Sequence, residues 1–164
     1  MAKRLEEKII ERTYSILKSK LSEIIKPTFR IGKVTELTKE QIIEIKQEFG
    51  IEGIILDIDG TVRKDMGKLP KANEEWIETI KKELPVIVVS NGIDGQMEEF
   101  LKAKDIGYIA FAHKPLKSGF QKACNKLGVK PEKMLVIGDD IWTDIYGGKR
   151  NNMKTVLVDK VEER

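Results

Sequence analysis

The pattern that most constrains the fold is an alternation, after Gly50, of short apolar runs with longer amphipathic stretches. A strand with one face in solvent alternates apolar and polar residues. Continuously apolar runs such as these are typical of strands buried on both faces. Strands that alternate with helical stretches favour parallel pairing, because a helix carries the chain back between them. We therefore predict a doubly wound, Rossmann-like α/β fold. Its five-stranded parallel sheet would comprise Gly53–Ile58, Val86–Val89, Tyr108–Phe111, Met134–Ile137 and Thr155–Val158.

Helices are expected to flank this sheet. Those between and after the strands are predicted at Asn73–Glu83, Asp94–Lys104, Leu116–Leu127 and Ile141–Gly147. A helix before the first strand is expected from Thr38 to Phe49, because Thr38 and Gln41 have the spacing of a capping box and Gly50 suits the position after the helix. The chain from residue 31 to residue 164 is therefore predicted to form one α/β domain.

The first 30 residues differ from the rest in charge and pattern. Between Leu5 and Ile25 the apolar residues fall on one broad arc of a helix, with basic side chains on the other side. Pro27 ends this helix, since the residue before a proline is driven out of the α region. Residues 1–30 hold eight basic and four acidic side chains, whereas the other 134 residues hold 22 and 23. We predict a basic amphipathic helical extension over residues 1–30.

Composition excludes several classes of protein. With 164 residues the chain can bury a core without disulfides, and its single cysteine, Cys124, rules out a disulfide scaffold or a cysteine-rich zinc site. No apolar run approaches the ~20 residues of a membrane span, and the charged N-terminus is unlike a signal peptide. A net charge of +3 is too small to indicate nucleic-acid binding. We expect a cytoplasmic protein without a nucleic-acid partner.

Polar side chains with catalytic potential follow four of the predicted strands. In an open α/β sheet such groups gather beyond the carboxyl ends of the strands. The candidates are Asp57, Asp59 and Thr61 after the first strand, Ser90 and Asn91 after the second, Lys114 after the third, and Asp139, Asp140 and Asp144 after the fourth. Converging carboxylates repel each other and need a cation, and oxygen ligands suit Mg²⁺. The sequence therefore predicts a Mg²⁺ site beside a lysine.

These groups suit phosphoryl transfer. A carboxylate kept ionised by a metal ion and by Lys114 can attack phosphorus and form an aspartyl-phosphate. Asp57 is the expected nucleophile, and Asp59, two residues on, can protonate the leaving oxygen and later activate water. The Ser90 hydroxyl and the Asn91 backbone N–H would supply hydrogen bonds to the transferring group, whose charge Lys114 and Mg²⁺ would neutralise.

Four motifs resemble, in order, those of the haloacid dehalogenase superfamily of phosphatases. They are DIDGT at 57–61, VVSN at 88–91, HKP at 113–115 and GDD at 138–140 followed by Asp144. The resemblance implies that Asp57 is the nucleophile and Asp59 the general acid/base. It also implies that Mg²⁺ is held by Asp57, by the backbone carbonyl of Asp59 and by Asp139. Phosphate-binding roles are implied for Thr61, Ser90 and Asn91, an orienting role for Lys114, and supporting roles for Asp144 and Asp140. Asp140 can equally be a simple helix cap.

The spacing of the motifs predicts an open site. Many members of the superfamily carry a cap domain inserted between two motifs. Here 28 residues separate Thr61 from Ser90 and 22 separate Asn91 from Lys114, whereas an independent domain needs roughly 50 residues. We therefore expect a capless member, whose site admits a phosphate attached to something large.

A closer likeness concerns the substrate. VTEL at 34–37, GIEGIILDIDGT at 50–61, KPL at 114–116 and GDDIWTDIYGGKRN at 138–151 resemble phosphatases that act on phosphatidylglycerophosphate. The resemblance implies an anionic phospholipid substrate. The basic helix, residues 1–26, could then contact the inner face of a membrane as a peripheral anchor. Its Ile/Leu face could instead pack on its own domain or on a second subunit.

Two further functions stay open at this point. A capless phosphatase could act on nucleotides, sugar phosphates or phosphoproteins. More remotely, the chain could be a signalling module that stores phosphate on aspartate, although Asp59 would hydrolyse such a phosphate quickly. Basic residues near the motifs could add positive charge around the mouth of the site or could equally be ordinary solvated side chains; they are Arg63, Lys64, Lys149 and Arg150.

Overall fold

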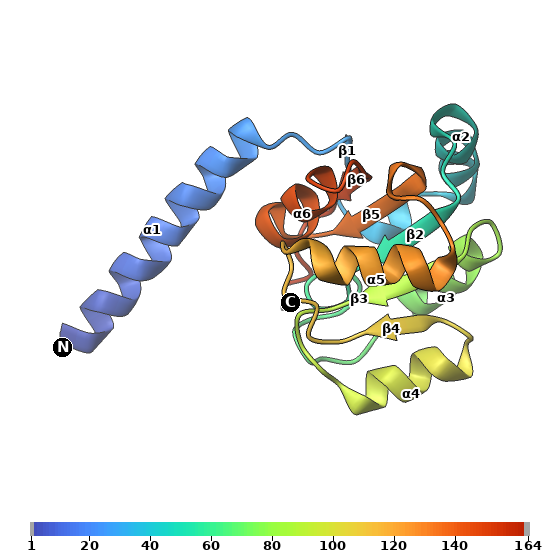
Figure 1. The fold of residues 1–164 in the computed structure, drawn as a ribbon. Coiled ribbons are helices and arrows are strands. Elements are labelled where there is room, and N and C mark those ends of the chain that lie inside the picture. Colours follow the sequence, from blue (N-terminus) through green and yellow to red (C-terminus); the bar gives the residue numbers. More distant parts are fainter. Residues whose placement is uncertain (1, 163–164) are drawn as a thin grey trace.

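The sheet of this protein has six parallel strands in the order β1-β6-β5-β2-β3-β4 (Figure 1). The structure, a computed structural model, describes residues 2–162, so Met1, Glu163 and Arg164 of the predicted ranges lie outside the described residues. The strands are β1 (Phe29–Arg30), β2 (Gly53–Leu56), β3 (Val86–Val89), β4 (Gly107–Ile109), β5 (Met134–Gly138) and β6 (Lys154–Leu157). The predicted α/β class is confirmed, and the strand count of five is corrected to six.

The strand missing from the prediction is β1. It is two residues long, with Phe29 paired to Val156 and Arg30 to Leu157. Just before it, Thr28 and Thr155 exchange hydrogen bonds from backbone N–H to side-chain hydroxyl, at 3.1 and 3.0 Å. Two residues show no periodicity in a sequence, so this strand is defined only by its pairing with the edge of β6.

The central strands are buried on both faces, as the absence of polar alternation predicts. In β2, Ile54 and Leu56 belong to one core cluster while Ile55 belongs to the other. The same two-residue alternation places Val88 of β3 in the first cluster and Ile87 in the second. Because successive side chains of a strand point to opposite faces, one sheet supports two cores.

Helices cover both faces of the sheet (Figure 1). The first core includes side chains from α2 (Lys39–Phe49), α3 (Lys71–Lys81) and α4 (Gly95–Ala103). On the opposite face lie α5 (Lys117–Leu127) and the short α6 (Gly147–Lys149). The predicted capping box of α2 is present: Thr38 accepts from the Gln41 N–H at 3.2 Å, and the Gln41 side chain accepts from the Thr38 N–H at 3.0 Å.

The N-terminal helix α1 (Ala2–Ile24) extends away from the domain (Figure 1). Toward its C-terminal end, Leu21 of α1 and the following Ile25 pack against a small cluster of Ile141, Ile145 and Leu157. Lys18 of α1 pairs with Asp140 at 3.5 Å. The predicted amphipathic helix therefore exists, with most of its apolar side chains exposed. Among the residues that the structure describes, no helix has the length and apolar character needed to cross a bilayer.

Candidate active site

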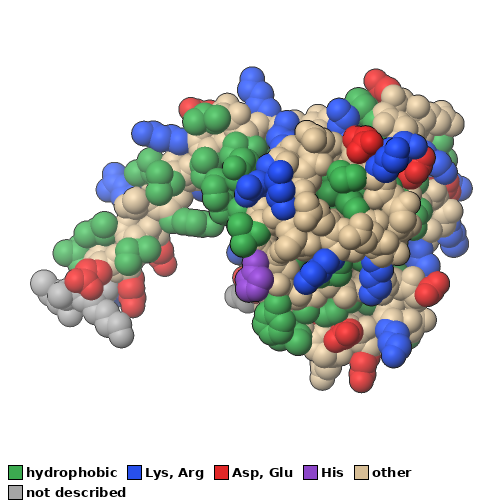
Figure 2. Space-filling model, in the orientation of Figure 1, with side chains coloured by type: hydrophobic (Ala, Val, Ile, Leu, Met, Phe, Trp, Pro, Cys, Tyr) green, Lys and Arg blue, Asp and Glu red, His purple; other side chains and the backbone are tan. Residues whose placement is uncertain are grey.

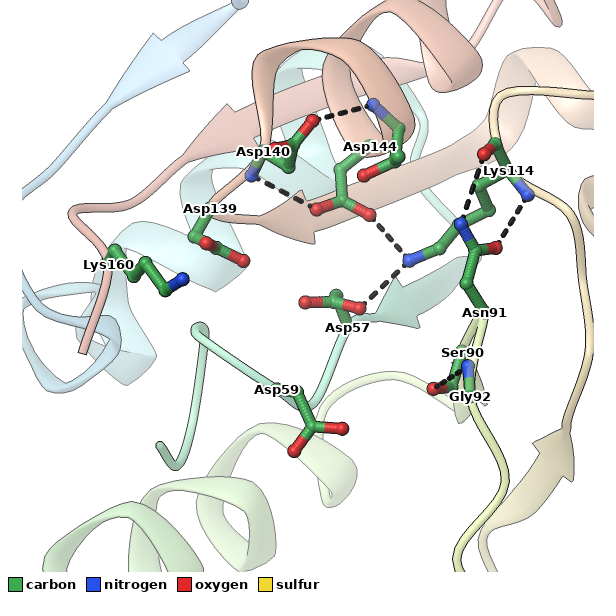
Figure 3. A pocket seen from close by; sticks show the side chains of 11 residues that line it. Asp57, Asp59, Ser90, Asn91, Gly92, Lys114, Asp139, Asp140, Asp144 and Lys160 are labelled. Atoms are coloured by element: carbon green, nitrogen blue, oxygen red, sulfur yellow. Dashed lines mark hydrogen bonds and ion pairs between the residues drawn. The ribbon is translucent and has the colours of Figure 1, made fainter. Parts of the chain in front are cut away.

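The order of the strands decides where the site forms. The chain builds β2, β3 and β4 toward one edge and then returns to place β5 and β6 on the other side of β2. Loops diverge at such a switch point, which leaves a hollow beyond the carboxyl ends of β2 and β5. Asp57 follows β2 and Asp139 follows β5, so the two carboxylates face each other across this hollow (Figure 3).

Lys114 lies between two carboxylates at the bottom of the hollow. Its Nζ donates to Oδ1 of Asp57 at 2.8 Å and to Oδ1 of Asp144 at 2.6 Å. The residue is only 6% exposed. Burial lowers the pKa of Lys114, but the charges of Asp144 and Asp57 outweigh it, so the net pKa is raised. Lys114 therefore stays protonated and places a positive charge against Asp57.

Asp139 carries the clearest sign of unbalanced negative charge. Burial, and then repulsion from Asp57, raise its pKa to about 6. The Thr61 hydroxyl lies 2.8 Å from Oδ2 of Asp57 and 3.0 Å from Oδ1 of Asp139, and its single proton serves one of them at a time. Burial and the Asp57 charge also act to raise the pKa of Asp144, although Lys114 opposes them.

The donor set fits a hard divalent cation. Asp57, Asp139 and Asp144 each offer a carboxylate oxygen within 4.8 Å of the others. Such oxygens are the ligands that Mg²⁺ and similar ions prefer, and a cation would relieve the repulsion that raises the pKa of Asp139. Asp144, for which the resemblance implied a supporting role, joins this cluster. The Asp59 carboxylate does not, and the expectation that Asp59 holds the metal through its backbone carbonyl stays a prediction.

Asp59 is turned away from Asp57 (Figure 3). Its Oδ1 accepts from Arg63 Nε at 2.8 Å and from the Met66 N–H at 2.9 Å. Arg63 also pairs with Asp94 at 2.9 Å and is only 5% exposed. Neither expectation for Arg63, a charge at the mouth or a solvated side chain, is met: the side chain is buried and paired with two carboxylates.

Ser90 and Asn91 lie at the end of β3 and line the hollow. The Ser90 hydroxyl accepts from the Gly92 N–H at 3.2 Å. The Asn91 side chain binds the backbone of Lys114 twice, accepting from its N–H at 2.6 Å and donating to its carbonyl at 3.0 Å. The Asn91 amide thus fixes the loop that carries Lys114, while its backbone N–H keeps the predicted phosphate-binding role as an expectation.

Asp140 and Asp144 are organised by one turn of π-helix, Ile141–Tyr146, after β5. Asp140 caps this turn, accepting from the N–H groups of Trp142 and Thr143 at 2.9 Å each. Its backbone N–H donates to Oδ2 of Asp144 at 3.2 Å. Burial raises the pKa of Asp140, but these N–H groups and Lys18 of α1 outweigh it, so the pKa is lowered.

Most of the predicted residues therefore meet in one hollow. Those that line it are Asp57, Asp59, Ser90, Asn91, Lys114, Asp139, Asp140 and Asp144. Thr61 lies just beneath, 1% exposed, with its hydroxyl directed at Asp57 and Asp139. Sequence reasoning missed Gly92, Thr143 and Lys160, which also line the hollow. Gly92 and Thr143 adjoin motif residues, but Lys160 follows β6 and carries no motif signal.

The structure also bears on access to the hollow. In the part of the chain that the structure describes, residues 62–89 hold only α3 and β3 besides loops, and residues 92–113 hold only α4 and β4. No separate cap domain lies between the motifs in these ranges. The site therefore opens directly to the surface.

Comparisons with known proteins identify a family. The family of haloacid dehalogenase-like hydrolases matches residues 3–152. The "Probable phosphatase YqeG" of Bacillus subtilis (strain 168) is 31% identical over 140 residues, covering 84% of this chain and 79% of that protein. A match to a "Glyceraldehyde 3-phosphate phosphatase" of Pyrococcus furiosus, 36% identical over 61 residues, covers 37% of this chain but only 25% of that protein.

Solved structures support the fold. An uncharacterized protein from Listeria monocytogenes serotype 4b has a TM-score of 0.55 at 17% identity, over 70% of this chain and 84% of the other. A HAD phosphatase from Thermococcus onnurineus has a TM-score of 0.50 at 16% identity, over 70% and 89%. Likeness at this level of identity concerns the architecture alone.

Proposed function

This chain belongs to the haloacid dehalogenase-like hydrolases and is a phosphatase of that family, and we propose that it dephosphorylates phosphatidylglycerophosphate with the help of Mg²⁺. The observation that carries the chemistry is the buried Lys114 between Asp57 and Asp144, opposite Asp139. A large substrate is supported by the lack of a cap domain between the motifs in the described ranges, which leaves the site open.

In the proposed first step, a carboxylate oxygen of Asp57 attacks phosphorus. The bond from phosphorus to the glycerol oxygen breaks as the aspartyl-phosphate bond forms. Asp59, rotated inward from its contact with Arg63, gives its proton to the leaving oxygen. Ser90 and the Asn91 backbone N–H donate hydrogen bonds to the phosphoryl oxygens, and the Lys114 ammonium orients Asp57.

In the second step, Asp59, now a carboxylate, takes a proton from water, and the resulting hydroxide attacks the aspartyl-phosphate. Inorganic phosphate leaves and Asp57 is restored. A bound Mg²⁺, held by Asp57, Asp139 and the Asp59 backbone carbonyl with Asp144 in support, would supply positive charge to the transferring group. Thr61 would position the two carboxylates that its hydroxyl contacts.

Two alternatives share this chemistry in part. The same open site could serve nucleotides, sugar phosphates or phosphoproteins. The partial match to a glyceraldehyde 3-phosphate phosphatase is the reason for considering a small substrate. Storage of phosphate on aspartate would require that Asp59 take no part in hydrolysis. A phospho-form stable for minutes would favour that last function.

The test is a phosphate-release assay with the full chain and Mg²⁺. Phosphatidylglycerophosphate in mixed micelles is compared with glycerol 3-phosphate, nucleotides and a phosphopeptide. We expect kcat/KM for the lipid to exceed the others by at least about tenfold, or ~1.4 kcal/mol. Asp57→Asn should lose at least ~10³-fold on every substrate, since the nucleophile is gone. Equal or faster turnover of a soluble phosphate would refute the lipid substrate.

A further inference from the structure

The exposed apolar side chains of the domain gather at one edge of the molecule. Outside α1, the large hydrophobic residues that are exposed among the described residues are Met66, Ile93, Phe111, Leu116 and Trp142, at 44–65% exposure. Isolated surface hydrophobics are common and need no explanation. The gathering of these five at one edge needs an explanation, because an exposed apolar area marks a binding surface. We call these five side chains the apolar rim.

The rim surrounds the active site. Met66 follows β2, Ile93 follows the Ser90–Gly92 segment after β3, and Trp142 follows Asp140 after β5. Phe111 and Leu116 stand on either side of Lys114 in the loop after β4. Four rim residues therefore lie in loops at the carboxyl ends of the strands, and Trp142 lies in the π-helical turn that follows β5. The catalytic carboxylates lie at the same end of the sheet.

Helix α1 continues this surface. It extends on the side toward which the strands point (Figure 1), and its apolar side chains are visible along it in Figure 2. Tyr14, Leu17 and Leu21 of α1 line a mainly apolar hollow with Ile141 and Trp142 of the π-helical turn, and the paired Lys18 and Asp140 also line it. The exposed apolar residues of α1 are Leu5, Ile9, Ile10, Tyr14, Ile16, Leu17 and Ile24. The apolar rim and the apolar face of α1 thus form a surface of separate apolar side chains beside the polar hollow of the active site.

We propose that this surface, the apolar rim together with the apolar face of α1, docks on an anionic lipid bilayer and so brings phosphate groups at the bilayer surface to Asp57. This proposal rests on the proposed function in one respect: the proposed substrate is a lipid, which the bilayer presents to the enzyme. Separate side chains around a hollow can each enter between lipid headgroups, whereas a protein partner would have to match the rim and the buried carboxylates at once.

Charge and aromatic content favour a lipid surface. Residues 1–30 carry a net charge of +4, from eight basic and four acidic side chains, and anionic lipids attract such segments. Trp142 stacks on Tyr146 at 4.7 Å, and the guanidinium of Arg150 lies 5.5 Å from the centre of the Tyr146 ring. Trp and Tyr beside basic residues are enriched where a protein meets the headgroup region. A dimer formed by pairing of two α1 helices would cover the apolar face of α1 but would leave the apolar rim exposed.

The binding test uses the full chain and sedimentation with vesicles. We expect binding to phosphatidylcholine vesicles that contain phosphatidylglycerol, weaker binding to pure phosphatidylcholine, and release by salt. Leu116→Gln and Leu17→Gln should each lower affinity several-fold, and together at least about tenfold, because each removes buried hydrocarbon from the interface. Ser15→Gln, which places the same side chain on the polar face of α1, is the matched control and should bind as the unaltered chain does.

Tryptophan fluorescence gives a second, local measurement. The sequence has two tryptophans, of which Trp76 is 7% and Trp142 44% exposed. Brominated lipids in the vesicles should quench Trp142 and leave Trp76 emitting, because quenching needs contact with the acyl chains. Trp142→Phe should therefore abolish the lipid-dependent quenching without removing binding by α1. Quenching that persists in this variant would contradict the proposed orientation.

The outcomes separate docking from substrate. Hydrolysis of phosphatidylglycerophosphate in detergent micelles without any binding to vesicles would overturn the docking proposal and leave the proposed function standing. Vesicle binding without hydrolysis of this lipid would support docking and reject the substrate. Concentration-dependent dimers that Leu17→Gln and Leu116→Gln dissolve, with no vesicle binding, would show that a second copy of the chain covers this surface instead.

Discussion

Asp57, Asp139 and Asp144 form a cluster of like charges that the residues around them neutralise only in part. Lys114 pairs with Asp57 and Asp144, whereas burial and then repulsion from Asp57 raise the pKa of Asp139 to about 6. The places of these residues after the carboxyl ends of the predicted strands indicated that they would meet. They did not indicate that the Asn91 side chain would hold Lys114 by its backbone or that Arg63 would hold Asp59, because such hydrogen bonds depend on loop conformation.

Gly60 offers a test of how tightly the cluster is packed. Its φ is +85°, and a Cβ at this position would lie 2.6 Å from Oδ2 of Asp139. We expect Gly60→Ala to displace the Asp139 carboxylate and to weaken Mg²⁺ activation by about 10–100-fold. The measurement is the Mg²⁺ concentration for half-maximal phosphate release, with Gly95→Ala as control because its Cβ would meet nothing within 4 Å. An unchanged Mg²⁺ requirement would show that Asp139 is not a ligand.

Elements with strong local signals were predicted well. Helix α2 begins and ends where its capping box and Gly50 indicate, because these signals act within a few residues. The two-residue β1 escaped prediction because its hydrogen bonds are made with a strand at the other end of the chain. The π-helical turn at Ile141–Tyr146 was predicted as an ordinary helix, since the capping residue Asp140 looks the same in both cases.

The cap of α2 should be measurable in stability. Thr38→Ala removes the side-chain oxygen that accepts from the Gln41 N–H and should lower the free energy of unfolding by about 1 kcal/mol. Thr38→Ser should recover most of this loss. Thr35→Ala, three residues earlier and also exposed, should change stability by less than ~0.5 kcal/mol. Urea unfolding followed by circular dichroism measures all three, and equal effects at both threonines would show that the cap contributes nothing.

At the scale of the whole molecule, the carboxylate cluster should couple metal binding to pH. An acid whose folded pKa is raised destabilises the folded state where it must ionise, so the contribution of Asp139 becomes less favourable as pH rises from its ordinary pKa of 3.8 toward about 6. Mg²⁺ binds the ionised form. Saturating Mg²⁺ should therefore stabilise the chain by about 1–3 kcal/mol at about pH 7.5 and by clearly less at about pH 5.

Thermal unfolding with and without Mg²⁺ at the two pH values measures this coupling. Asp139→Asn is the control: it removes the repulsion, so the metal-free variant should unfold at a higher temperature than the unaltered chain near neutral pH, and it should gain little from Mg²⁺. A Mg²⁺ effect of the same size at both pH values would mean that Asp139 does not titrate in this range.

The sequence by itself determined the α/β class, the parallel pairing and the set of carboxylates and lysine at the strand ends. These features follow from periodicity and from residue types at fixed places along single strands. Only the tertiary structure decided that Asp59 turns toward Arg63, that Asp144 joins the carboxylate cluster, and that α1 continues the apolar rim. The physical reason is that Asp144 and α1 make contacts with segments far away in the chain, and the approach of those segments depends on packing of the whole molecule. The Asp59–Arg63 pair joins residues only four apart, but it depends on the conformation of an irregular loop, which no local pattern specifies.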